Sequence, residues 1–227
     1  MCFDYLNNTI EDEQLREKMT PTYPIGAKRI LTANGYYEAL TQQNVELVTE
    51  EIKCIGQTGI ETSDGLSRDF DVIIYGTGFV TNPFLDDIDI VGRGGKTLSN
   101  HWSQGAHAHL GVATHNFPNL FFLYGPNTNL GHNSILLMSE AQIKLIMQIL
   151  LASEHSGWRS AEVRKDVEDA YNETLQQRLR STVWNEVSES WYRIGDRITN
   201  NWPGSVGEYR RILRRFSPGD FLLDKTG

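Results

Sequence analysis

The sequence predicts an α/β fold built around a parallel or mixed sheet. Residues 71–75 (DVIIY) form a near-continuous apolar run that stops at Gly76-Thr77-Gly78, as a strand buried on both faces does. A second apolar run, residues 120–124, stops at Gly125-Pro126-Asn127 and leads to a long apolar helix over about 134–151. Apolar strands that end in tight turns and alternate with helices are typical of α/β proteins.

The other expected elements are shorter or more polar. Apolar residues repeat at every fourth position between Val163 and Val183, which predicts an amphipathic helix that runs to Trp184. A polar helix over residues 1–20 is expected to end at Pro21 and Pro24. The pattern then predicts a short helix around residues 36–40 and short strands at 45–48, 52–55 and 59–62, with a turn at 63–65.

Length and charge restrict the function classes. The chain's 227 residues suffice for one large domain or two small ones. Its formal net charge of −8 repels phosphate backbones and argues against nucleic acid as a partner. Cys2 and Cys54 have no metal or CxxC spacing, so we expect reduced thiols and a cytoplasmic protein. No apolar run approaches the ~20 residues that cross a bilayer, so no transmembrane segment is expected.

The histidines gather in one stretch of the chain. Two of them, His107 and His109, have a spacing that could place two metal ligands on one side of an extended segment. No carboxylate or cysteine within the stretch has ligand spacing, so structural or loop histidines are the favoured interpretation and no metal site is expected. A histidine-bound metal hydrolase stays the weaker alternative. Five of the six histidines fall within 32 residues, at His101, His107, His109, His115 and His132.

Residues 119–136 (NLFFLYGPNTNLGHNSIL) form the segment of the sequence that most favours a binding site. A buried strand delivers the chain to a turn, and a polar loop then leads into the N-terminus of the long helix. Free backbone N–H groups and the positive end of the helix dipole meet there, which suits an anionic or electron-rich group such as a phosphate or the edge of a reduced flavin. An ordinary strand-to-helix connection is the alternative.

Two groups of basic residues are further candidates for a functional site. Lys28 and Arg29 follow Pro24-Ile25-Gly26, and an arginine there could stabilise a developing oxyanion; a structural ion pair is the alternative. The basic run over residues 208–216 could contact a phosphate or a membrane surface. The favoured interpretation is that Ile212, Leu213 and Phe216 dock on the core while the arginines stay solvated.

Five sequence blocks together resemble the C-terminal part of the flavin-dependent Baeyer–Villiger monooxygenases, in the flavin-containing monooxygenase superfamily. Each block is a modest signal, but their occurrence in the family's order across nearly the whole chain is specific. The blocks are residues 15–29 (LREKMTPTYPIGAKR), 35–40 with 44–48 (GYYEAL and NVELV), 71–79 (DVIIYGTGF), 117–134 (FPNLFFLYGPNTNLGHNS) and 190–204 (SWYRIGDRITNNWPG).

The resemblance implies a partial fold of two dinucleotide-binding, Rossmann-like α/β domains, one for FAD and one for NADPH. In the family the FAD domain is discontinuous, because the chain leaves it, builds the NADPH domain and returns. By this resemblance, residues 1–80 close the NADPH domain. Residues 81–227 then form the returning C-terminal part of the FAD domain, with a helical lid and tail.

The resemblance also implies roles for single residues. Arg29 matches the catalytic arginine that stabilises the flavin peroxide and the tetrahedral adduct, and Lys28 matches the lysine associated with the NADPH 2′-phosphate. Trp191 matches the mobile-loop tryptophan that closes over NADP. The implied chemistry is hydride transfer from NADPH to FAD, capture of oxygen as a peroxyflavin, and attack on a ketone to give an ester or lactone. The other implied cofactor-binding residues are Gly76, Thr77, Gly78, Gly125, Pro126, Asn127, Thr128, Asn129, Leu130 and Gly131.

The sequence departs from the family's pattern in several places. Ala27 stands where relatives often have cysteine, and Gly76 replaces the usual alanine of the ATG motif. The GxGxxG fingerprint for FAD, the second glycine motif for NADPH and the signature FxGxxxHxxxWP do not occur in the chain. Without the N-terminal βαβ unit that binds the pyrophosphate, we expect the chain not to hold FAD by itself.

Two functions remain in view. The first is a truncated Baeyer–Villiger segment, inactive without an N-terminal FAD-binding half and acting on a small ketone when complemented. The alternative is a non-catalytic remnant that serves as an α/β interaction module or as a partner of a full-length paralogue. In both cases the strands at 71–75 and 120–124 should expose apolar edges that a second segment covers, so we expect aggregation or obligate association.

Overall fold

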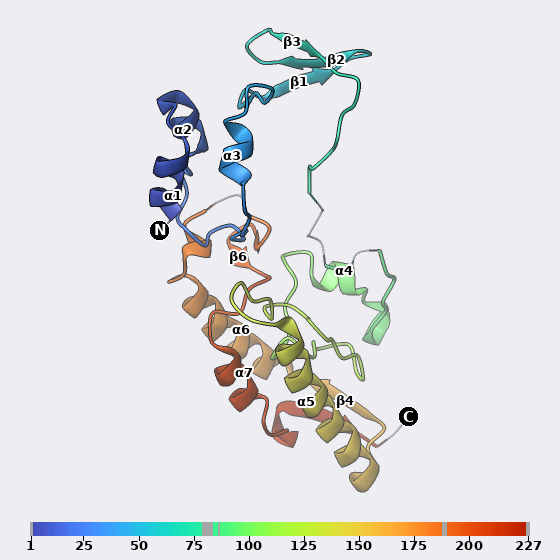
Figure 1. Cartoon of the computed structure of the whole chain (residues 1–227). Coiled ribbons are helices and arrows are strands. Elements are labelled where there is room, and N and C mark those ends of the chain that lie inside the picture. The colour runs from blue at the N-terminus through green and yellow to red at the C-terminus, as the bar shows by residue number, and fades with distance from the viewer. Residues whose placement is uncertain (1, 79–83, 86, 188–189, 226–227) are drawn as a thin grey trace. The chain divides into compact units, whose positions relative to one another are not determined.

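The computed structural model describes residues 2–78, 84–85, 87–187 and 190–225. The chain divides into two compact units (Figure 1). Unit 1 comprises Met1–Thr22 and Leu31–Phe79, and unit 2 comprises Tyr23–Ile30 and Val80–Gly227. The domain boundary expected at residue 80 lies outside the described residues. Unit 2 is therefore built from two stretches of sequence, of which the first is only a short segment.

Unit 1 begins with two helices where the sequence predicts one. They are α1 (Cys2–Thr9) and α2 (Glu13–Met19), and the break lies at Asp12, whose backbone is extended. The Asp12 carboxylate accepts hydrogen bonds from the N–H groups of Gln14 and Leu15, at 2.8 and 3.1 Å. This N-cap satisfies two amides that a new helix leaves without partners, so the chain starts α2 there. The short helix predicted next is confirmed as α3 (Tyr36–Leu40).

The rest of unit 1 is a three-stranded antiparallel sheet of β1 (Ile52–Ile55), β2 (Gly59–Thr62) and β3 (Ser67–Asp69). The first two strands have the predicted bounds. The predicted turn between β2 and β3 is also confirmed, with Gly65 at a φ of 84°. In this turn the Thr62 hydroxyl donates a hydrogen bond to the Asp64 carboxylate at 2.5 Å.

Three predicted strands are wrong. Residues 45–48, 71–75 and 120–124 have no strand structure. A strand persists only where its backbone pairs with a neighbour, and none of the described residues forms a ladder with these segments. The apolar side chains of residues 71–75 are nevertheless present on the surface, with Ile74 90% and Val72 73% exposed. The expected exposure of apolar groups is thus observed, although the strand itself is not formed.

The core of unit 2 is formed mainly by three helices, α5 (Ile135–Ser156), α6 (Lys165–Leu179) and α7 (Val206–Ile212) (Figure 1). The two long helices match predictions within a few residues. The buried residues of each long helix recur at helical spacing, and on α6 they include the polar Glu168 and Asn172. Trp202 and Tyr209 fill the centre, with ring centroids 5.2 Å apart. From the C-terminal basic run, Leu213 is buried and Phe216 packs against the core, whereas Ile212 is 41% exposed.

Short elements complete unit 2. The strands β4 (Ser160–Val163) and β7 (Phe221–Asp224) pair antiparallel over four residues, and β5 (Arg193–Ile194) with β6 (Arg197–Ile198) forms a small hairpin. The helix α4 (Leu98–His101) lies in the loop-rich region before α5. Among the described helices, α5 alone is long and apolar enough to span a bilayer, a test that core helices of soluble proteins also pass.

Candidate functional site

A short segment carries Arg29 into unit 2. Ala27 is completely buried, and its N–H donates a hydrogen bond to the Pro24 carbonyl at 3.1 Å. The Trp184 indole N–H donates to the carbonyl oxygen of Gly26 at 3.1 Å. These contacts fix the backbone on both sides of the turn and leave the Arg29 side chain exposed. Arg29 is thus positioned by unit 2, although its sequence neighbours on both sides of Tyr23–Ile30 belong to unit 1.

The positive charge of Arg29 affects two tyrosines electrostatically. Burial raises the pKa of Tyr124 and of Tyr192, and the positive charge of Arg29 partly opposes this rise. Both phenols are therefore protonated at neutral pH. The Tyr124 hydroxyl donates a hydrogen bond to the Asn129 side-chain oxygen at 2.9 Å. Among the described residues no carboxylate forms an ion pair with Arg29, so its charge stays available to a ligand.

The root of the 125–131 loop is buried and held by the segment that follows β5. The Asn127 amide group donates hydrogen bonds to the carbonyl oxygens of Ile198 and Asn201, at 2.8 and 3.1 Å. The Asn129 amide donates to the Asn201 side-chain oxygen at 2.8 Å. The Thr128 hydroxyl donates to the Gly125 carbonyl at 2.7 Å. Four of the predicted cofactor-binding residues therefore use their polar groups, at least in part, to hold the loop in shape.

The tip of the same loop faces solvent. Residues 131–134 are exposed, and a Cβ atom on Gly131 would meet no atom within 4 Å. Ser134 is the N-cap of α5, and its hydroxyl accepts a hydrogen bond from the Leu136 N–H at 3.3 Å. The exposed tip therefore leaves the N-terminus of the 22-residue helix α5, where the helix dipole is positive, next to solvent.

The remaining predicted residues are distributed between the units. The Lys28 ammonium lies 4.5 Å from the centroid of the Tyr23 ring and is exposed. Trp191 is 56% exposed and precedes Tyr192 in the chain. Residues 76–78 belong to unit 1, where they are exposed and follow no strand.

Known proteins match the chain over nearly its full length. A Baeyer–Villiger monooxygenase of Pseudomonas aeruginosa is 40% identical over the whole chain and 44% of its own length. An FAD-binding monooxygenase of Aspergillus niger is 35% identical over 99% of the chain and 38% of its own length. Among solved structures, an oxidized steroid monooxygenase bound to NADP aligns with a TM-score of 0.88 and 31% identity, over 99% of this chain and 44% of that one. No family model matches the chain.

The chain is therefore similar to a part of Baeyer–Villiger and FAD-binding monooxygenases. It spans less than half the length of the relatives it matches. Its partial α/β fold agrees with theirs, since a cyclohexanone monooxygenase from Rhodococcus sp. Phi1 bound to NADP⁺ also aligns with a TM-score of 0.83, at 29% identity over 98% of this chain and 44% of that one.

Two features of the candidate site were not predicted from the sequence. Tyr124 and Tyr192 lie beside Arg29, and Asn201 holds the loop through Asn129. Tyr124 directly precedes Gly125, so its place next to the loop was readable from the sequence. The pairing of Asn201 with Asn129 spans 72 residues and had no local signal.

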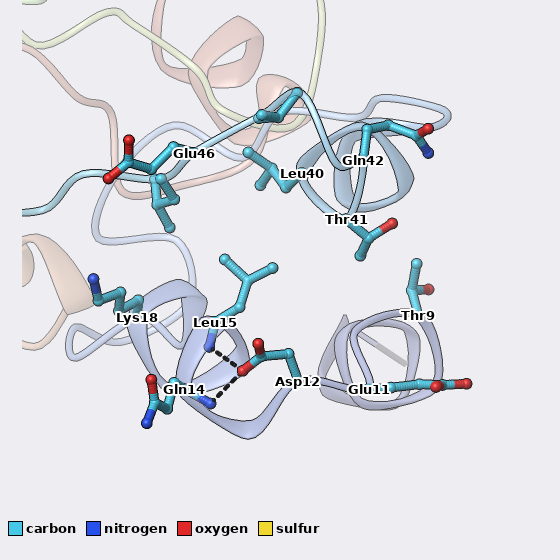
Figure 2. Close-up of a pocket in the computed structure, with 12 residues that line it drawn as sticks. Thr9, Glu11, Asp12, Gln14, Leu15, Lys18, Leu40, Thr41, Gln42 and Glu46 are labelled. Carbon is cyan, nitrogen blue, oxygen red and sulfur yellow. Dashed lines mark hydrogen bonds between the residues drawn. The ribbon is translucent and has the colours of Figure 1, made fainter. Parts of the chain in front are cut away.

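A pocket of about 620 Å³ in unit 1 holds none of the predicted site residues (Figure 2). Leu15 and Leu40 point toward one another across it, and the Asp12 carboxylate at its edge is occupied by the N-cap bonds of α2. Glu11 and Glu46 add acidic groups to the lining, against the single cation of Lys18. This acidic lining is unsuited to a dinucleotide phosphate.

Proposed function

We propose that this chain supplies part of an FAD- and NADPH-dependent Baeyer–Villiger monooxygenase that acts on a small ketone in the cytoplasm. The observation that carries the proposal is that Arg29 belongs to unit 2, where its charge reaches Tyr124 and Tyr192, in a chain 40% identical to a Baeyer–Villiger monooxygenase. The relatives' names and bound ligands support FAD and NADP as the cofactors of the complete enzyme.

The residues present fit one side of a flavin. The exposed loop tip at Gly131 leaves room for a flat ligand at the N-terminus of α5, where the helix dipole favours an electron-rich group. When bound, the flavin supplies the redox chemistry that amino-acid side chains lack. The sequence contains no GxGxxG, so the pyrophosphate anchor must come from a segment outside these 227 residues.

Lys28 and Trp191 fit the NADPH side of the site. The Lys28 ammonium is exposed and forms no ion pair among the residues described, so it can bind the 2′-phosphate as a point charge. The exposed Trp191 ring offers an apolar surface beside Tyr192 that can cover a bound nicotinamide nucleotide.

Arg29 supplies the catalytic cation in this proposal. A guanidinium stays protonated at any working pH, and it stabilises an oxyanion best where nothing else neutralises it. The neighbouring phenols of Tyr124 and Tyr192 are neutral at pH 7, because burial raises the pKa of each. Arg29 can therefore direct its full charge at oxygen atoms that become negative during the reaction, while the tyrosines line the site.

A second polypeptide segment must cover the exposed apolar groups. Ile74 is 90% exposed, and Val72 and Leu136 are each 73% exposed. Such groups favour association with a partner that buries them. The proposed partner is an N-terminal FAD-binding half or a full-length paralogue. The same observation also favours the second candidate function, a non-catalytic α/β interaction module.

The experiment combines this chain with the missing part. The chain is mixed with the separately produced N-terminal segment of the Pseudomonas aeruginosa relative, and the complex is tested for bound flavin, NADPH oxidation and ester formation from a ketone. The proposal expects a yellow complex that consumes NADPH and forms ester. A complex without flavin or NADPH consumption would refute the enzyme and leave the interaction module, and failure to form any complex would refute both.

Two variants separate the role of Arg29 from folding. Arg29→Ala should keep flavin and complex formation but reduce ester yield at least about a hundredfold, in line with the loss of one oxyanion-stabilising donor. Arg180→Ala is the matched control, since Arg180 is an exposed arginine at the end of α6. Equal ester yields in the two variants would contradict a catalytic role for Arg29.

A further inference from the structure

Three imidazoles and one carboxylate lie close together inside unit 2. The rings of His101 and His115 have centroids 4.5 Å apart, and those of His101 and His107 are 4.9 Å apart. Glu168 comes from the first turn of α6, and its side chain is completely buried. Ligand atoms of His101, His115 and Glu168 all lie within 4.8 Å of one another.

Glu168 already orients one of these rings. Its Oε2 accepts hydrogen bonds from Nδ1 of His115 at 2.8 Å and from the His115 backbone N–H at 2.7 Å. Nδ1 of His115 therefore faces the carboxylate, and the two donor atoms lie close enough to be ligands of one ion that takes the place of the proton between them.

His107 provides the independent observation. Its Nδ1 is buried and has no hydrogen-bond partner among the described residues, and it lies 3.9 Å from Oε1 of Glu168. That distance is too long for a hydrogen bond. A buried polar atom without a partner is costly, and a bound ion is one of its few explanations.

We propose that His101, His107, His115 and Glu168 bind one divalent transition-metal ion of the Zn²⁺ type. Three imidazole nitrogens with one carboxylate oxygen are a donor set that Zn²⁺ accepts in tetrahedral geometry. The site is closed and largely buried, so the ion is structural. It ties the 101–115 region to α6 and has no place in the oxygen-transfer chemistry proposed for Arg29. Sequence spacing disfavoured a metal site because the carboxylate lies 53 residues beyond His115.

Thr114 is the competitor of the metal. Its hydroxyl donates to Oε1 of Glu168 at 2.8 Å and lies 3.0 Å from Nε2 of His101. It therefore occupies two of the donor atoms that the ion would use. Binding must turn this hydroxyl away. Thr114→Val removes the hydroxyl at nearly constant shape, so it should leave zinc affinity unchanged or tighten it, whereas it should weaken a purely hydrogen-bonded cluster.

The test is zinc titration of the full chain after treatment with a chelator. Isothermal calorimetry should give one Zn²⁺ per chain, and Co²⁺ should give the strong visible absorption of four-coordinate cobalt. His101→Ala and Glu168→Gln should each weaken zinc binding at least about tenfold. His155→Gln is the control, because His155 is exposed on the last turn of α5.

Thermal unfolding supplies the second readout. Zinc should raise the Tm of the wild type, the control and Thr114→Val, but not that of His101→Ala. Glu168 is fully buried and its variant can fail to fold, so His101→Ala, at a partly exposed position, carries the test alone in that case. Absence of zinc binding, or the same affinity in His101→Ala and the control, would overturn the proposal and leave a hydrogen-bonded cluster.

Discussion

Replacing Gln142 with leucine removes three hydrogen bonds from the centre of unit 2. Gln142 is completely buried on α5. Its side-chain oxygen accepts the backbone N–H of Tyr124 at 2.9 Å, and its amide donates to the Gly111 carbonyl at 3.3 Å and to the Tyr209 hydroxyl at 3.0 Å. Leucine has a similar volume, so the change removes the polar contacts and keeps most of the packing.

The expected loss follows from the number of bonds and their burial. Each neutral hydrogen bond contributes about 1 kcal/mol net, so three lost bonds should lower the free energy of unfolding of unit 2 by about 3 kcal/mol. Gln148 is the matched control on the same helix. It also makes three such contacts, with Lys144, Arg214 and Phe216. These contacts are more accessible to water, which can replace them, so Gln148→Leu should cost less than about 1 kcal/mol.

Urea denaturation followed by tryptophan fluorescence measures the difference. All five tryptophans lie in unit 2, so the signal reports the unfolding of that unit. The expected result is a clearly lower urea midpoint for Gln142→Leu and a near-normal one for Gln148→Leu. Equal losses in the two variants, or a loss below about 1 kcal/mol for Gln142→Leu, would refute the reasoning that burial makes these bonds costly to break.

Three further predictions test other contacts. In the complemented enzyme, Lys28→Ala should raise KM for NADPH about tenfold, because the variant loses one charge-assisted contact with the 2′-phosphate. KM for NADH, which lacks that phosphate, should not rise. Equal changes in the two KM values would contradict phosphate binding. Gly111→Ala should cost more than about 2 kcal/mol in urea titration, since its Cβ would lie 2.2 Å from a neighbouring side chain. Gly131→Ala should cost less than about 0.5 kcal/mol. At alkaline pH, unit 2 should lose stability, because burial holds the pKa of Tyr124 and Tyr192 above the ordinary 10.0. The stability that the two protonated phenols contribute is complete below pH ~10 and disappears as pH rises through their pKa values in the folded chain. Tyrosinate absorbance that appears at the same pH in the folded and the urea-unfolded chain would contradict this prediction.

Local signals predicted the elements whose partners are near in sequence. The bounds of β1 and β2 were predictable because each strand pairs with its sequence neighbour across a short connection. The apolar run at residues 71–75 gave an equally strong strand signal, yet no described strand lies beside it. Periodicity reports that a segment is suited to burial. It does not report whether the covering surface belongs to the same chain.

The candidate site was predictable only as far as motifs reach. Arg29, Lys28 and the 125–131 loop were found because they match continuous blocks of a known family. The cluster at Glu168 was missed because a helix brings its carboxylate to histidines more than fifty residues earlier. No spacing rule covers such a contact, and only the packing of α6 against the 101–115 region creates it.

The placement of Arg29 connects the fold to the proposed chemistry. Its flanking sequence on both sides belongs to unit 1, yet Ala27 and the bond from Trp184 to Gly26 attach its segment to unit 2. The 125–131 loop is fixed to the same unit through Asn201. The distance between the Arg29 cation and the loop that we propose to face the flavin is therefore set within one unit. A catalytic cation needs that constancy, because its stabilising effect depends on where the oxyanion forms relative to its N–H groups.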